Sequence, residues 1–274
     1  MQEGATSVII VPFEDNAYQH GKIAFKLTDM QLLDSNVWMV TNSLKVFLEI
    51  LTNYYFTSQT KKVDWRSKNK VTKVKDQGSC GSCYTFSTNV AVETGYAIKH
   101  NSLRNLSEQQ LLDCDNRSSG CNGGWMSNCL KSIQEKGGIM SAEAYPYTGR
   151  KAGCKFRASM KVAEVSQFAQ FRSKDEAAMA RSVASDMGAV PIAINANDPF
   201  MSYKRGVFDL CSQATDAVNH AVAIVGYGTD ETNKDYWIIK NSWGPSWGEN
   251  GYMRIRRNGN ICGLSNYAWQ VSVK

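Results

Sequence analysis

The residues best suited to nucleophilic chemistry lie in the segment Gln77-Gly-Ser-Cys-Gly-Ser-Cys83. A cysteine attacks as its thiolate, and a free thiol with a pKa of about 8.5 needs help to ionise near neutral pH. A helix beginning at Cys83 would place partial positive charge at the sulfur, and a nearby imidazolium would stabilise the thiolate further. The amide of Gln77 and the backbone N–H of Cys83 could then stabilise an oxyanion.

The imidazole is expected from His220, which precedes the apolar, strand-like run Ala221–Gly226. A histidine at the start of a strand is ordinary when it stands alone. Asn241 follows a second apolar run, and its side chain can accept the other imidazole N–H and fix the tautomer. Trp243 would shield that hydrogen bond from water. Together with Cys83, these residues predict an acyl-transfer site.

Three motifs in this order resemble the papain and cathepsin family of cysteine proteases. Cys80-Gly-Ser-Cys-Tyr84 fits a local signature already known for that family, in which a histidine and an asparagine follow much later. Here His220 and Asn241 follow Cys83 by 137 and 158 residues. The resemblance runs from Val63 to the C-terminus, which is roughly four-fifths of the chain.

This resemblance implies a cysteine endopeptidase that works through an acyl-enzyme, with Cys83, His220, Asn241 and Gln77 at the catalytic and oxyanion positions. It implies an α+β, two-lobed papain-like fold, with a helical left lobe, a β-barrel-like right lobe and the active site in the cleft between them. No cofactor or metal is expected. The alternative is a catalytically inactive relative that binds peptides or partners, supported by Tyr84, where most members have tryptophan, and by the unusual N-terminal segment.

The hydrophobic pattern independently favours an α+β chain, because helix-like segments come first and strand-like segments follow. Capping boxes at Ser107 and Ser173 and the pair Gly137-Gly138 mark helix ends. The expected helices begin at Ser82 or Cys83, at Ser107 and at Ser173, with another between 124 and 137. The expected strands are Val190–Asn195, Ala221–Gly226, Tyr236–Lys240 and Tyr252–Arg256.

Substrate contacts follow from the resemblance. Gly123-Gly124 resembles the family's backbone platform for an extended peptide. An apolar pocket for the second residue before the cut would favour a hydrophobic side chain. The chain has no adjacent histidine pair to grip a substrate C-terminus, which favours an endopeptidase over a carboxydipeptidase. The expected substrate-binding residues are Gly81, Gly123, Gly124, Trp125, Met126, Ala193, Val218, Asn219, Trp243 and Tyr267.

All eight cysteines lie between Cys80 and Cys262, and their spacing gives no zinc-finger pattern. One alternative is a redox-active Cys80–Cys83 pair, but an oxidising compartment with structural disulfides explains more of the cysteines. The resemblance implies the pairs Cys80–Cys121, Cys114–Cys154 and Cys211–Cys262. Cys129 is then left over, and we expect it to be a buried small hydrophobe.

Residues 1–60 contain no cysteine and carry a net charge of −3, whereas residues 61–274 carry +9. Residues 16–30 resemble the tail of a family propeptide, so we interpret residues 1–60 as a propeptide-like or atypical segment and 61–274 as the peptidase domain. The opposite charges suggest that the segment docks on the domain, and the resemblance implies that it would act there as an intramolecular inhibitor. The start of the chain is not a convincing secretory signal, although a lysosomal, vacuolar or extracellular location is expected.

The remaining partners are expected to be polypeptide substrates of a monomeric enzyme. The basic residues are scattered, which favours solvated surface over nucleic-acid binding. No apolar stretch is long enough to span a membrane. Asn105 and Asn116 begin glycosylation sequons, which are weak signals alone.

Overall fold

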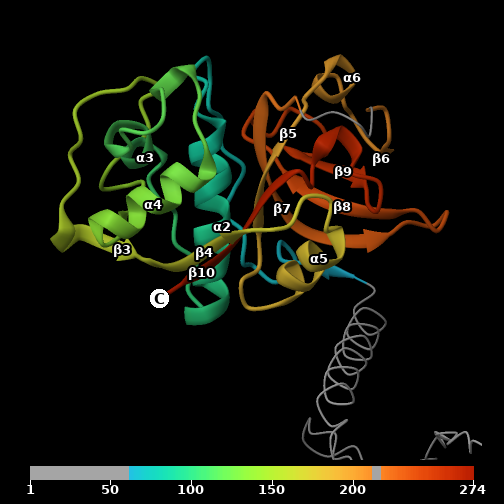
Figure 1. The fold of residues 1–274 in the computed structure, drawn as a ribbon, viewed down its shortest axis with the longest axis horizontal. Helices are drawn as coiled ribbons and strands as arrows, with labels where there is room; N and C mark the ends of the chain where they lie inside the picture. The colour runs from blue at the N-terminus through green and yellow to red at the C-terminus, as the bar shows by residue number, and fades with distance from the viewer. Residues whose placement is uncertain (1–61, 212–216) are drawn as a thin grey trace, which may run out of the picture. The chain divides into compact units, whose positions relative to one another are not determined.

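A computed structural model describes residues 62–211 and 217–274. The N-terminal segment expected at residues 1–60 lies outside the described residues. The described residues form two lobes with separate hydrophobic cores, one gathered around helices and one inside a sheet. Figure 1 shows the helical lobe on the left and the sheet on the right.

The central element is helix α2 (Cys83–His100), which begins at the residue predicted from the sequence. Thirteen of its 18 residues are buried, so it lacks the polar face of a surface helix. It packs against the other helices and also against the sheet. Asn101 ends the helix in the left-handed conformation. The N-terminus of α2 therefore has a fixed position between the lobes.

The helical lobe also contains α3 (Glu108–Cys114) and α4 (Met126–Lys136). Ser107 caps α3 by accepting from the backbone N–H of Gln110, but Gln110 does not complete the expected capping box. Its side chain instead accepts from Met140 N and donates to Gly138 O. Gly137 ends α4 as predicted. The short elements of this lobe are η1 (Gly120–Asn122), β2 (Ile139–Met140), η2 (Ala158–Met160) and β3 (Lys161–Ala163).

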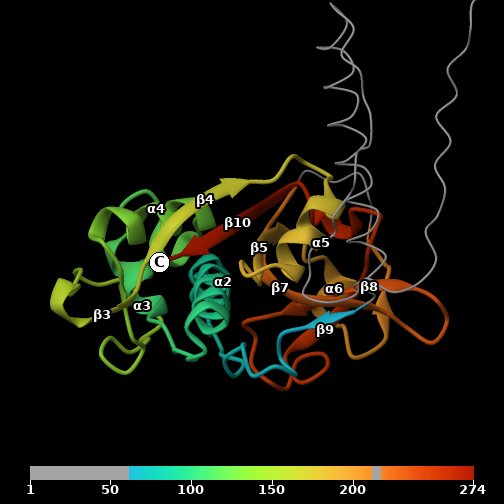
Figure 2. The same cartoon turned by 90° about the horizontal axis from the view of Figure 1, so that it is seen from below.

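Eight strands of the described chain form one sheet in the order β4-β10-β5-β7-β8-β9-β6, with β1 paired to β7. All neighbours are antiparallel except β6 and β9. The four predicted strands correspond to β5, β7, β8 and β9, whereas β4 and β10 were missed. Figure 2 shows β4 and β10 side by side, running from the sheet toward the helical lobe. The strands are β1 (Val63–Asp64), β4 (Val165–Gln170), β5 (Val190–Ile194), β6 (Val207–Phe208), β7 (His220–Thr229), β8 (Asp235–Lys240), β9 (Tyr252–Arg256) and β10 (Tyr267–Val273).

The helix predicted near Ser173 is present, but it begins at Glu176, so its predicted start was wrong. Helix α5 (Glu176–Ala184) is capped by Asp175, and Ser173 donates to Asn266 instead. The carboxylate of Glu176 is buried and accepts from three consecutive backbone N–H groups, at 258, 259 and 260, and from Trp237 Nε1. Glu176 therefore fixes a loop of the sheet lobe. The remaining short helices are α6 (Asp198–Met201) and η3 (Ile261–Gly263).

Candidate active site

Cys83 is the first residue of α2, as the sequence predicted, and its thiol is free. The preceding loop is tied to the helical lobe by the Cys80–Cys121 disulfide and by a hydrogen bond from Gly81 N to Cys121 O of 2.8 Å. A Cβ at Gly81 would lie 2.5 Å from that oxygen, so only glycine allows this approach. The sulfur is thereby held at a helix N-terminus, where the partial positive charge favours a thiolate.

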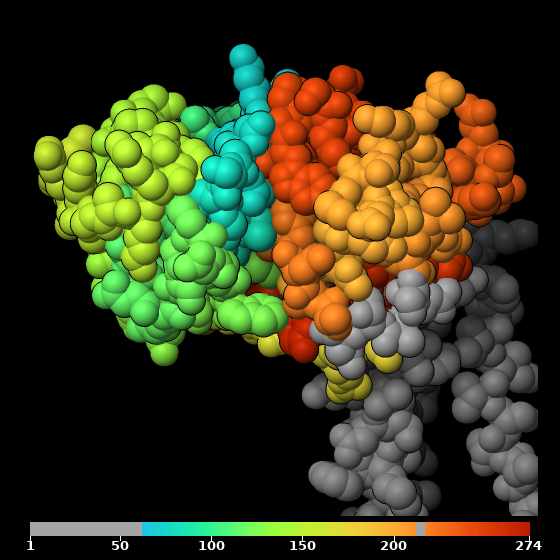
Figure 3. All heavy atoms as spheres, turned by 90° about the horizontal axis from the view of Figure 1, so that it is seen from above, coloured from blue at the N-terminus to red at the C-terminus, as the bar shows by residue number. Residues whose placement is uncertain are grey.

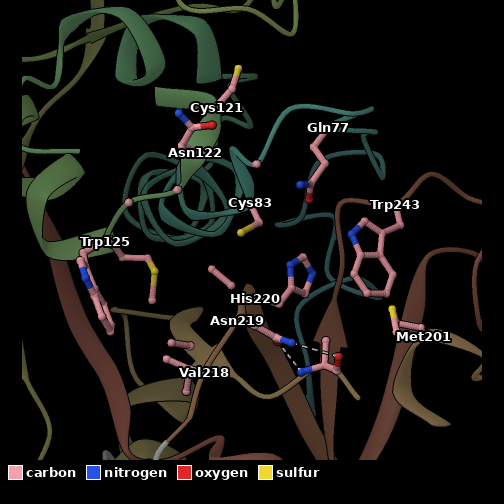
Figure 4. A pocket seen from close by; sticks show the side chains of 17 residues that line it. Gln77, Cys83, Cys121, Asn122, Trp125, Met201, Val218, Asn219, His220 and Trp243 are labelled. Atoms are coloured by element: carbon pink, nitrogen blue, oxygen red, sulfur yellow. Dashed lines mark hydrogen bonds between the residues drawn. The ribbon is translucent and has the colours of Figure 1, made fainter. Parts of the chain in front are cut away.

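His220 opens β7 and is 7% exposed. Its Nε2 lies 2.8 Å from Asn241 Oδ1, which also accepts from the backbone N–H of Ser242. Because the backbone N–H of Ser242 donates to that atom, the atom is the amide oxygen, and Nε2 of His220 must then carry the hydrogen. Nδ1 is then the ring atom left for proton transfer. Figure 4 shows the Cys83 side chain and the His220 ring beside one another in the same cleft.

Trp243 covers the histidine. Its ring stacks on that of His220 with centroids 4.4 Å apart and an interplanar angle of 25°. Phe200 and Trp247 pack edge-on against Trp243 and hold it in place. The bond between His220 and Asn241 is therefore kept from water, which strengthens it.

Gln77 lies beside the cleft, with its side-chain orientation fixed at both ends (Figure 4). Its Nε2 donates to Cys80 O at 3.0 Å, and its Oε1 accepts from Ser242 Oγ at 2.8 Å. The second N–H of this amide is left for an oxyanion. Ser242 was not predicted from the sequence, where its only signal is its position next to Asn241.

Two segments far apart in sequence run antiparallel behind these side chains. Gln77 N donates to Ser242 O at 2.9 Å, Gly244 N donates to Lys75 O at 3.1 Å, and Asp76 pairs with Trp243. The segment carrying Gln77 is thus joined by backbone hydrogen bonds to the segment that carries Asn241 and Trp243.

A cleft of about 520 Å³ contains Cys83 and His220. Figure 3 looks onto the face where the cyan and green part of the chain meets the orange and red part. Of the expected substrate-binding residues, all but Tyr267 line this cleft. Further lining residues were not predicted to bind substrate. These additional residues are Cys121, Asn122, Ala196, Met201 and Ala221.

One end of the cleft is apolar. Trp125 and Val218 lie on the same side of the cleft (Figure 4), and Met126, which follows Trp125 in the chain, also lines it. Tyr267 packs edge-on against Trp125, with ring centroids 5.3 Å apart, and does not line the cleft. The side chain of Asn219 exchanges hydrogen bonds with the backbone of Ala196. The side-chain amide of Asn219 is therefore bonded within the protein and is not directed at a ligand, although the residue forms part of the cleft wall.

Burial acts on both reactive groups. It raises the pKa of the Cys83 thiol, which backbone hydrogen bonds oppose. It lowers the pKa of His220 to about 4, which the bond to Asn241 opposes. A lone charge on either group is thus disfavoured, whereas a thiolate and an imidazolium formed together compensate each other. The arrangement suits proton transfer from sulfur to nitrogen.

The remaining cysteines form the three pairs that the resemblance implied, Cys80–Cys121, Cys114–Cys154 and Cys211–Cys262. Cys80 is therefore not paired with Cys83. Cys129 is a free thiol on α4 and fully buried, as expected of a small hydrophobe. Tyr84 is also buried and donates to Gly120 O at 3.1 Å, so its hydroxyl is satisfied away from Cys83.

A model of the papain family, described as "Papain family cysteine protease", matches residues 59–272. The chain belongs to this family. Papain-family relatives include a viral cathepsin of Choristoneura fumiferana nuclear polyhedrosis virus, 41% identical over 74% of this chain and 61% of its own length. Pro-cathepsin H of Bos taurus is 45% identical over 74% of this chain and 62% of its own length. Bromelain from Ananas comosus, solved with the E64 inhibitor, superposes with a TM-score of 0.74 at 37% identity, covering 78% of this chain and all of that one.

The α+β papain-like fold is thus confirmed. The chain spans about three-fifths of the length of the viral cathepsins and of pro-cathepsin H. Within the described ranges no helix is long and apolar enough to cross a membrane. The same residues contain no group of three or more His, Cys, Asp or Glu side chains that could hold a metal ion.

Proposed function

We propose that this chain is a cysteine endopeptidase in which Cys83 is the nucleophile, His220 the proton carrier, Asn241 the residue that orients it and Gln77 an oxyanion donor. The observation that carries this proposal is the shared cleft: a free thiol at a helix N-terminus and an imidazole, one of whose nitrogens is held by an amide oxygen, line the same cavity.

The reaction begins with the Cys83 proton on Nδ1 of His220. The thiolate attacks the peptide carbonyl carbon, and the new S–C bond places negative charge on oxygen. Gln77 Nε2 and the backbone N–H of Cys83 donate to that oxygen. The C–N bond then breaks as His220 gives its proton to the leaving amine.

The acyl-enzyme is then hydrolysed. His220 Nδ1 takes a proton from water, whose oxygen attacks the thioester carbon. Collapse of this second oxyanion breaks the C–S bond and restores the thiolate–imidazolium pair. Asn241 accepts from Nε2 throughout, so the ring keeps its orientation while Nδ1 gains and loses its proton.

For specificity, we propose that Gly123 and Gly124 pair with an extended substrate backbone and that the apolar end of the cleft takes the second residue before the cut. Trp125, Met126 and Val218 offer no charged partner to a substrate side chain there. Peptides with leucine or phenylalanine at this place should exceed matched arginine peptides in kcat/KM by at least about tenfold, the scale of one buried apolar side chain.

We further propose that residues 1–60 are a propeptide-like segment that inhibits the peptidase domain at 61–274, and that the mature enzyme is monomeric. Its three disulfides favour an oxidising destination, lysosomal, vacuolar or extracellular. N-terminal sequencing and gel filtration after activation would test the first two points, and fractionation would test the third.

The deciding experiment is labelling with E64, the inhibitor bound in the bromelain structure. We expect one equivalent to attach at Cys83 with loss of peptidase activity, and no turnover by Cys83→Ala. Cys129→Ala is the matched control, because its thiol is free but fully buried. If the protein takes no label and cleaves nothing even after residues 1–60 have been removed, it is the non-catalytic binding relative.

A further inference from the structure

A buried ionic cluster lies behind Asn241. Lys75 Nζ donates to Glu93 Oε1 at 3.0 Å and to Glu108 Oε1 at 2.6 Å. Lys240 Nζ donates to the carbonyl and hydroxyl oxygens of Thr72, and that hydroxyl donates to Glu93. The proposed mechanism uses none of these groups. Burying charged groups costs desolvation free energy, and the proposed mechanism does not explain why these four are buried.

Asn241 connects the active site to this cluster. It follows Lys240 in the chain and is 3% exposed. Its Oδ1 faces His220, but its Nδ2 is a buried donor with no protein acceptor among the described residues. An unpaired buried N–H is rare in proteins, and a bound water is a common reason for one.

A small cavity beside the cluster is lined in part by Asn241. Its volume is about 10 Å³, close to the least that one water molecule needs. The lining includes polar groups from α2, from α3, from the end of β8 and from the loop before α2. These polar residues are Ser87, Glu108, Lys240, Asn241, Ser242 and Lys75.

We propose that this cavity binds one water molecule, which accepts from Asn241 Nδ2 and donates to the carboxylate of Glu108. Glu108 is then a positioning residue for the pair Asn241 and His220, and this inference rests on the function proposed for that pair.

The lining can satisfy the water fully. An ammonium has three N–H bonds, and Thr72 takes two of those on Lys240. Ser87 Oγ gives its hydrogen to Val222 O at 2.6 Å and therefore presents lone pairs to the cavity. Asn241 and Lys240 supply two donors, while Glu108 and Ser87 supply two acceptors, which matches the four bonds that a water can make.

The water has a consequence for catalysis. Because the water holds Nδ2, the side-chain amide of Asn241 cannot turn its NH₂ group toward His220 without losing the water-mediated bond to Glu108. Oδ1 thus stays aimed at Nε2, and that bond favours the protonated ring. The charged groups around this arrangement are Lys75, Glu93, Glu108 and Lys240 on one side and Cys83 on the other.

A crystal structure of the E64-labelled enzyme tests the site directly. We expect one ordered water within about 3.2 Å of both Asn241 Nδ2 and a Glu108 carboxylate oxygen. An empty cavity, or an Asn241 Nδ2 bonded to protein, would overturn the proposal. Failure of E64 to attach at Cys83 would instead count against the proposed function, because the water does not depend on labelling.

Val90→Ile tests the consequence, because Val90 lines the cavity and one added methyl group displaces the water. We expect kcat to fall about 3- to 10-fold with little change in KM. We also expect the alkaline limb of kcat/KM to move down by about half a pH unit, since a weaker bond from Asn241 disfavours imidazolium.

Val92→Ile is the matched control, because Val92 is buried on the same helix but does not line the cavity. It carries the same overpacking cost and should leave the alkaline limb where it is. Equal shifts in both variants, or no shift in Val90→Ile, would show that the cavity does not position the amide.

Discussion

The hydrogen bond between Ser242 and Gln77 gives a sharp test of the oxyanion site. Gln77→Ala removes the side-chain donor and should lower kcat by about 10²- to 10³-fold. Ser242→Ala keeps that donor but removes the group that fixes its orientation, and leaves the buried Oε1 without its 2.8 Å partner. A buried neutral hydrogen bond is worth about 0.5–1.5 kcal/mol, so Ser242→Ala should cost about 2- to 12-fold.

A double-mutant cycle separates this role from a merely structural one. If Ser242 acts through Gln77, Ser242→Ala should have almost no effect on kcat once Gln77 is alanine. The assay is turnover of a fluorogenic peptide, with the concentration of active enzyme set by E64 titration. Ser132→Ala, another buried serine but on α4, controls for the loss of a hydroxyl. The same fold loss from Ser242→Ala in both backgrounds would refute the reasoning.

Three further predictions concern Asn241, His220 and Glu176. Asn241→Ala should slow turnover and move the alkaline limb of kcat/KM to lower pH, because the bond from Asn241 raises the pKa of His220; an unmoved limb in a pH profile would contradict this. In Cys83→Ala, His220 has no thiolate partner, and burial lowers its pKa from 6.5 to about 4 in the folded protein. Between pH 4 and pH 6.5 the unfolded protein therefore binds more protons at His220 than the folded protein does. The free energy of unfolding, measured with urea, should therefore fall by about 3 kcal/mol more between pH 7 and pH 4 than in Cys83→Ala/His220→Ala. Glu176→Gln replaces one carboxylate oxygen by an amide and so leaves two of four N–H groups without an acceptor; we expect about 3 kcal/mol lower stability in urea with near-normal kcat at low temperature, whereas unchanged stability would remove Glu176 from its role.

The parts that could be predicted from the sequence are those set by local rules. Cys83 begins α2 because the Gly-Ser before it suits a turn into a helix, and Gly137 ends α4 because it adopts φ 73°. His220 begins a strand because an unbroken apolar run follows it. The family resemblance supplied the disulfide pairs and the substrate pocket, which spacing alone does not contain.

The parts that were missed depend on distant partners. Ser173 and Glu176 have the spacing of a capping box, but the carboxylate of Glu176 is drawn to backbone donors more than 80 residues away, and Asp175 caps α5 instead. Gln110 is likewise drawn from its own helix end to Met140 and Gly138. In both cases a tertiary hydrogen bond replaces the local one, and a single sequence does not show which side chain will find such a partner.

The contacts of Gln77 explain how side chains from two lobes keep their relative positions in the site. Its backbone pairs with Ser242, in the segment that supports the histidine, while its amide donates to Cys80, which is tied by disulfide to the helical lobe. Gln77 is thus bonded to both sides of the cleft, and it lies only six residues before Cys83 in the chain. Any opening of the cleft that separates Cys83 from His220 must break at least one of these contacts. The oxyanion donor and the nucleophile–imidazole pair are therefore expected to be in place together or lost together.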